Sequence, residues 1–258
     1  MKRNIYVVLI ALIFLFAGLQ PAFSQEAASP DRGSGVTVDA LPGELKWLDI
    51  KDYHIVSEER PAGLIQTLLG HVVVRIGDTD RAYFAARGDQ IFEKDAIFTL
   101  KGARCRVRFN TDDIVTMGQN SRIGVDEIID DRKNKKKKSV ISMLRGRAMF
   151  YVMRLFRYKT AQTLVKTPTA ICGVRGTKFG VEVRKTDKKL AQTGPVYLAD
   201  ASGSGAEYLM AAAGTNGTTT IVYGFEGEVE VTSPVDGSTQ TVGDGQNLEL
   251  TGEGAGDV

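Results

Sequence analysis

Histidine and cysteine are scarce in this chain, which holds only two residues of each type. A zinc site needs several such side chains close together, and a nucleophilic triad needs a histidine beside its nucleophile and its acidic partner. His54 and His71 lie on different expected elements, and no Gly-x-Ser-x-Gly elbow occurs. Because no acid, base, nucleophile or ligand set is recognisable, we expect a non-enzymatic protein that needs no cofactor and no metal.

The acidic groups in the sequence also lack the pattern of an ion site. Asp112-Asp113 lacks the remaining ligands of a calcium loop and is typical of a turn. Glu226, Glu228 and Glu230 alternate along an expected strand, where like charges usually form a solvated face. We interpret both groups as structural.

A large excess of one charge is missing as well, since the formal net charge is only +2 at pH 7. Two of the basic residues, Lys2 and Arg3, belong to an N-terminal leader that contains no acidic residue. Without that leader the chain is electrically balanced. The balance argues against nucleic acid as the partner.

The leader has the layout of a signal peptide. A basic start precedes the uncharged run Ile5–Leu19, and Ala22-Phe23-Ser24 offers small residues at both recognition positions for cleavage. We therefore expect residues 1–24 to be a signal peptide with a helical apolar core, and the protein to be periplasmic or secreted in a bacterial envelope. The alternative is an uncleaved N-terminal anchor; no later stretch is apolar enough to span a bilayer.

Residues 25–62 are expected to form a linker, because residues 25–40 are rich in Ala, Ser, Gly and Pro. Its second part contains Trp47 and Tyr53, interleaved with charged residues. This part is either a docking segment for a partner or a peripheral strand packed on its own domain. Residues 251–258 are expected to be a flexible tail.

From residue 63 to residue 250 the pattern is that of strands and turns, with no sustained helical period. Alternating positions share a face, and the expected inward sets are Val72, Val74 and Ile76; Cys105, Val107 and Phe109; Ala148, Phe150 and Val152; Phe179, Val181 and Val183; and Phe225, Val229 and Val231. Cys105 is then a buried thiol. With Cys172 it forms either a disulfide or a pair of separate thiols, since an oxidising destination permits both.

Two segments interrupt the strands and are expected to project as loops. Residues 126–138 change from acidic residues to the basic run Lys135, Lys136, Lys137 and Lys138. This run is interpreted as a solvated hairpin tip, with contact to an anionic lipid or an acidic envelope surface as the alternative. The second segment, residues 185–217, is rich in Ala, Gly, Ser and Thr and is expected to be an insertion.

The centre of the domain carries a recognisable motif. Val165–Ala170 contains Thr167, Pro168 and Thr169, and it is followed by Gly173-Val174-Arg175-Gly176-Thr177-Lys178-Phe179. This combination resembles the central motif of FecR domains, named for the periplasmic regulator of iron-citrate uptake. Gly88–Thr99 resembles the opening turns of such domains, while Gly224–Val231 and Val242–Gln246 resemble their closing strands.

The residues of the motif have a physical interpretation of their own. Pro168 cannot donate to a ladder, so Thr167-Pro168 should end a strand, and Gly173 and Gly176 permit a tight turn. Arg175 points inward by strand parity, or outward if Gly176 introduces a bulge. It is interpreted as a structural arginine, with ligand binding as the alternative.

The resemblance implies an all-β fold, an irregular β-roll or β-solenoid, with a two-sheet β-sandwich as the alternative. It also implies a sensor, adaptor or scaffold that binds an envelope protein. Only Met1–Asn4 precede the apolar run, so we expect no cytoplasmic anti-sigma region. The second hypothesis is a structural protein that binds cell wall or polysaccharide through exposed β surfaces.

Overall fold

A computed structural model describes residues 32–153, 156, 158–185 and 215–254, which fold into a compact unit. The predicted signal peptide, residues 25–31 of the expected linker, and most of the 185–217 insertion lie outside the described residues. Among those described, no helix is both long and apolar enough to span a bilayer. The unit is almost entirely β, which confirms the predicted fold class.

The strands form two layers. In the first layer the ladder order is β1–β4–β3–β6–β9–β10–β11–β12–β15–β16. These strands are β1 (Asp49–Lys51), β3 (Val72–Arg75), β4 (Arg81–Phe84), β6 (Ala96–Thr99), β9 (Arg122–Asp131), β10 (Lys136–Tyr151), β11 (Thr160–Lys166), β12 (Ile171–Val174), β15 (Val229–Thr232) and β16 (Thr239–Val242).

In the second layer the order is β5–β2–β7–β8–β10–β13–β14–β17. Besides β10, its strands are β2 (Gly63–Leu69), β5 (Gln90–Ile91), β7 (Arg104–Phe109), β8 (Ile114–Met117), β13 (Lys178–Lys185), β14 (Thr215–Glu226) and β17 (Asn247–Gly254). The chain passes repeatedly from one layer to the other, as expected for a roll.

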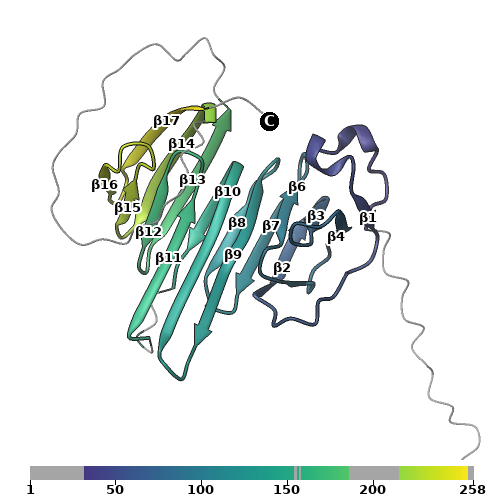
Figure 1. The fold of residues 1–258 in the computed structure, drawn as a ribbon, viewed down its shortest axis with the longest axis horizontal. Helices are drawn as coiled ribbons and strands as arrows, with labels where there is room; N and C mark the ends of the chain where they lie inside the picture. The colour runs from purple at the N-terminus through teal and green to yellow at the C-terminus, as the bar shows by residue number, and fades with distance from the viewer. Residues whose placement is uncertain (1–31, 154–155, 157, 186–214, 255–258) are drawn as a thin grey trace, which may run out of the picture. The chain divides into compact units, whose positions relative to one another are not determined.

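The long strand β10 belongs to both layers and lies at the centre of the unit (Figure 1). Its first part pairs with β9 and β11, and its last part, from Gly146, pairs with β8 and β13. Gly146 has a φ of +89°, and a Cβ on it would meet Ser121 Oγ at 2.3 Å. Glycine is therefore required where the strand changes layers.

One hydrophobic core fills the space between the layers. It joins side chains of the first layer, such as Val74 and Val165, to side chains of the second, such as Val107 and Phe179. The inward sets predicted around Cys105, Phe150 and Phe179 are confirmed, since all of their members are buried there.

Phe225 departs from its predicted face and is 48% exposed, whereas Val229 and Val231 are buried. The prediction treated these residues as one strand. Phe225 in fact lies near the end of β14, and Val229 begins β15 after a turn in which Gly227 has a φ of +81°. The alternation of faces restarts at that turn.

Part of the expected linker is packed rather than free. Residues 32–51, the N-terminal strap, contain the 3-10 turns η1 (Val38–Ala40) and η2 (Gly43–Leu45) and the edge strand β1. Leu41 and Leu45 are buried in a second core with Val73, Ala82, Phe84, Ala96, Phe98 and Leu100. These strands are apolar on both faces, so their outer face needs a cover.

Glu44 fixes the strap to the first layer. It accepts hydrogen bonds from Arg122 and from Arg145, the latter at 2.6 Å. Both guanidinium groups also lie over the ring of Phe98, at 5.2 and 6.0 Å from its centre. The predicted alternative of a peripheral strand therefore holds for β1, which pairs with β4.

Candidate functional site: a pocket beside the central motif

The Thr-Pro part of the motif ties the two layers together. β11 ends at Lys166, directly before Thr167 and Pro168, as predicted. Thr167 Oγ1 accepts the N–H of Ala170 at 2.8 Å. The hydroxyls of Thr167 and Thr169 lie 2.8 and 2.6 Å from Thr220 Oγ1 on β14 of the second layer. These buried bonds indicate a structural role.

The second part of the motif places Arg175 at the surface. β12 includes Gly173 and ends at Val174, and Gly176 has a φ of +75°. Arg175 is therefore exposed, which settles its direction in favour of the outward alternative. Thr177 donates to the main-chain oxygen of Glu228 at 3.2 Å. Phe179 is buried and stacks on Phe150, with ring centres 5.0 Å apart.

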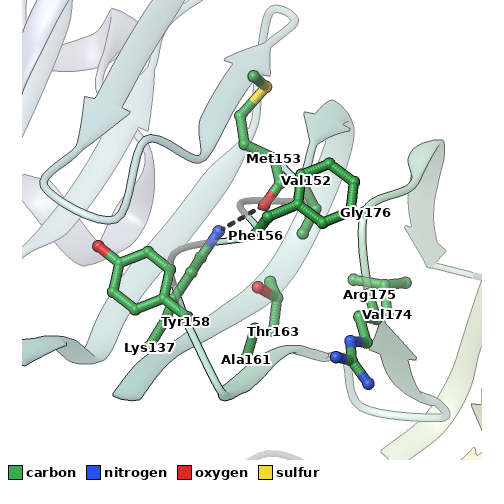
Figure 2. A pocket seen from close by; sticks show the side chains of 10 residues that line it. All are labelled: Lys137, Val152, Met153, Phe156, Tyr158, Ala161, Thr163, Val174, Arg175 and Gly176. Carbon is green, nitrogen blue, oxygen red and sulfur yellow. Dashed lines mark hydrogen bonds between the residues drawn. The ribbon is translucent and has the colours of Figure 1, made fainter. Parts of the chain in front are cut away.

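Arg175 and Gly176 line a cavity of about 100 Å³, which we call the Arg175 pocket (Figure 2). Strands β10, β11 and β12 and the segment after β10 contribute the other lining residues: Lys137, Val152, Met153, Phe156, Tyr158, Ala161, Thr163 and Val174. Met153 is 45% exposed and Phe156 is 93% exposed. The pocket thus opens beside apolar surface.

A buried ion pair forms one wall of the pocket. Lys137 Nζ lies 2.5 Å from Asp113 Oδ1 and also donates to the main-chain oxygen of Met153 at 3.1 Å. Asp113 accepts further bonds from Ser139, Thr163 and Thr111, and from the N–H of Met153. Such a network compensates the loss of hydration on burial. It also fixes the start of the segment that lines the pocket.

The pocket has one uncompensated positive charge. Lys137 and Asp113 neutralise each other, whereas Arg175 makes no hydrogen bond or ion pair with any residue that the structure describes. Among the described residues, Arg175 thus makes none of the bonds to turn carbonyls that a structural arginine would make. A guanidinium next to apolar side chains suits a ligand group that carries a carboxylate.

The basic run Lys135–Lys138 is not a solvated tip throughout, and it lies in a β-hairpin rather than a projecting loop. β9 and β10 pair along their length, and the turn between them ends at Lys135. Lys135 and Lys136 are exposed, but Lys138 is paired with Glu127 at 2.6 Å, and only 1% of the Lys137 side chain is exposed. Alternation along the strand turns Lys137 inward, so the prediction of an interaction surface is wrong for Lys137.

The remaining predicted site residues lie apart from the pocket. Cys105 and Cys172 are separate buried thiols, and burial raises the pKa of each to about 12. The disulfide alternative is therefore wrong. Trp47 is 88% exposed and belongs to the strap, and Tyr53 is 62% exposed. In the described part of the chain, no three His, Cys, Asp or Glu side chains are placed to hold a metal ion.

No sequence pattern indicated Asp113 as part of this site. We interpreted Asp112-Asp113 as turn residues, and Asp112 indeed has a φ of +63°. Asp113 is nevertheless buried, with a partner 24 residues away on β10. A single acidic residue before a strand carries no signal of such a long-range pairing.

Comparison with known proteins agrees with the geometry of the motif. Residues 95–193 match the family model described as FecR protein. This part of the chain is similar to FecR proteins. The matched part runs from Asp95, next to β6, through β13 and includes both Thr167-Pro168 and Arg175. No curated protein is similar enough to the chain to count as a match.

Two solved structures are similar to this chain. Both are crystal structures of a Parabacteroides distasonis protein described as a candidate anti-sigma factor, with 18% and 19% sequence identity and a TM-score of 0.39. Each alignment covers 62% of this chain. The alignments span 60% of the solved chain.

Proposed function

We propose that this chain is a non-enzymatic protein-interaction module of the bacterial envelope, which acts as a sensor, adaptor or scaffold of the FecR type. Its partner binds across the Arg175 pocket and supplies a carboxylate. The signal-peptide layout of residues 1–24 supports the location. The FecR match supports a regulatory rather than an enzymatic role.

The state of Arg175 carries the proposal. Arg175 is exposed and unpaired within the described structure, and it lines the same cavity as Met153, which is 45% exposed. Exposed arginine next to an apolar side chain is typical of the residues that dominate protein interfaces. Lys137 is already bonded to Asp113, so it forms part of the pocket wall and is not available to bind the partner's carboxylate.

Site-specific photocrosslinking tests the proposal. A crosslinking amino acid at Met153 should give a discrete protein adduct in cells of the source organism. The adduct should disappear with Arg175→Glu and persist with Arg175→Lys, because the charge rather than the exact side chain attracts a carboxylate.

Arg87 provides the matched control, since it is also exposed and lies after β4, six ladder steps from β12 in the first layer. Arg87→Glu should leave the adduct unchanged. If the adduct survives Arg175→Glu, or if a crosslinker at Arg87 gives the same product, the pocket is not the binding site.

A further inference from the structure

A second surface lies on the outer face of the second layer and is separate from the Arg175 pocket. Alternation along each strand turns one set of side chains into the core and the other set outward. On β7, β10 and β13 the outward set includes six cations, which we call the basic face: Arg104, Arg106, Arg108, Arg147, Lys178 and Arg184. Glu182 is the one acidic side chain in the same outward positions of these three strands.

The charges of the basic face are only partly compensated. Arg147 and Arg184 share Glu182, at 2.6 and 2.7 Å, and Arg108 pairs with Asp112 at 2.7 Å. Arg104 and Arg106 form no ion pair with any described residue, although the guanidinium of Arg106 lies over the ring of Tyr151, 5.7 Å from its centre.

An apolar groove of about 300 Å³ lies next to these cations. Met149, Tyr223 and Phe225 line it together with Arg104 and Arg147. Gly180 keeps the groove open, because a Cβ there would lie 3.2 Å from the ring of Phe225. Phe225 remains 48% exposed, and no described segment covers it. An apolar surface beside an arginine that forms no ion pair, here Arg104, is typical of a binding site.

We propose that the basic face binds an extended acidic segment of a partner protein, which places one apolar side chain in the groove. Arg104, Arg106 and Arg108 occupy alternate positions of β7, so they recur about every 6.6–6.8 Å along the strand. An extended peptide presents alternate side chains at the same interval. Acidic residues at every second position therefore match these arginines in both charge and spacing.

Fluorescence anisotropy with two synthetic peptides tests this inference on the full chain as purified. The probe is labelled Glu-Thr-Glu-Thr-Glu-Thr-Leu, in which the acidic side chains and the leucine share one face of the extended peptide, and the control peptide carries Lys in place of Glu. The acidic peptide should bind, and raising the salt from about 50 mM to about 300 mM should weaken the binding. Arg104→Glu should weaken it about tenfold, and Phe225→Ser should weaken it by a similar factor.

Matched variants separate this surface from other causes. Lys46→Glu, a charge reversal at an exposed position of the strap that covers the first layer, should leave peptide affinity unchanged. An unaltered melting temperature in Arg104→Glu confirms that the fold is intact; if that variant unfolds, Arg104→Gln, which removes charge without reversing it, takes its place.

Three outcomes would overturn the inference: no binding of the acidic peptide, equal binding of the lysine peptide, or affinity unchanged by both Arg104 and Phe225 variants. Polygalacturonate serves as a competitor. If it displaces the peptide at a lower concentration of carboxylates than the unlabelled peptide requires, the face binds an anionic polysaccharide instead.

Discussion

Lys137 Nζ lies 2.5 Å from Asp113 Oδ1, and these two side chains are only 1% and 2% exposed. Their elements are brought together solely by the fold, since the turn before β8 and the first part of β10 belong to different hairpins. This ion pair therefore forms only when the turn before β8 and the first part of β10 are packed together. It also positions the lining of the Arg175 pocket through Met153.

Removing Lys137 should destabilise the protein strongly. In Lys137→Met the Asp113 carboxylate stays buried without its cation, which costs about 3–5 kcal/mol in comparable pairs. Urea denaturation measures the change, and Lys136→Met, at an exposed neighbouring position, should stay within about 0.5 kcal/mol of the parent. Equal effects of the two substitutions would contradict the buried pair. Adding Asp113→Asn to Lys137→Met should recover part of the loss.

Asp95 should make stability depend on pH. Burial raises its pKa from 3.8 to about 6, although the N–H of Phe92 donates to it. The folded state holds this proton more tightly than the unfolded state. The resulting stabilisation is complete below about pH 4 and is lost as the pH rises through about 6, for a change of about 2–3 kcal/mol.

Urea denaturation between pH 4 and pH 7 measures this dependence, with Asp95→Asn as the reference. Asparagine keeps the acceptor for Phe92 but does not titrate. The stability of the parent should therefore fall relative to that of Asp95→Asn as the pH rises. A constant difference between the two proteins would show that Asp95 ionises normally.

The two cysteines should be unreactive in the folded protein. Burial raises the pKa of Cys105 and Cys172 to about 12, so little thiolate is present at neutral pH. Titration with a thiol reagent such as dithionitrobenzoate should detect no fast-reacting thiol in native protein and two in guanidinium. If the reagent detects no thiol in guanidinium without a reductant, the two cysteines form a disulfide.

Gly146→Ala should disturb the point at which β10 changes layers. The backbone there has a φ of +89°, and the added Cβ would meet Ser121 Cα at 2.5 Å. We expect a loss of about 2–4 kcal/mol from strain and overpacking combined. Gly43→Ala is the control, because a Cβ at Gly43 meets nothing within 4 Å. Thermal denaturation of both variants makes the comparison.

The sequence predicted those parts of the fold that depend on local alternation. Cys105 and Phe179 were assigned to the core because their strands alternate cleanly between apolar and polar residues. Alternation failed for Phe225, where a turn at Gly227 divides the expected strand in two. Packing of the strap on its own domain was predicted only as one of two alternatives, although strands such as Val72–Arg75 are apolar on both faces, which is the signal that a second covering layer exists.

The candidate site was less predictable, because it depends on contacts between distant segments. The motif indicated Arg175 correctly as a residue near a turn. Its neighbours in space, Lys137 and Met153, come from elements that local patterns place only as a charged run and a strand end. Strand pairing in three dimensions decides which of four consecutive lysines is buried, and periodicity gives no information about that pairing.

The division of β10 between the layers has a consequence for how the protein unfolds. Unfolding of one layer alone would leave half of this strand without hydrogen-bond partners. We therefore expect that neither layer opens independently of the other. The two layers should therefore exchange their protected amide hydrogens with a common free energy, as one cooperative unit. Many ladders also join residues far apart in the chain, which favours slow folding limited by the closure of these long loops.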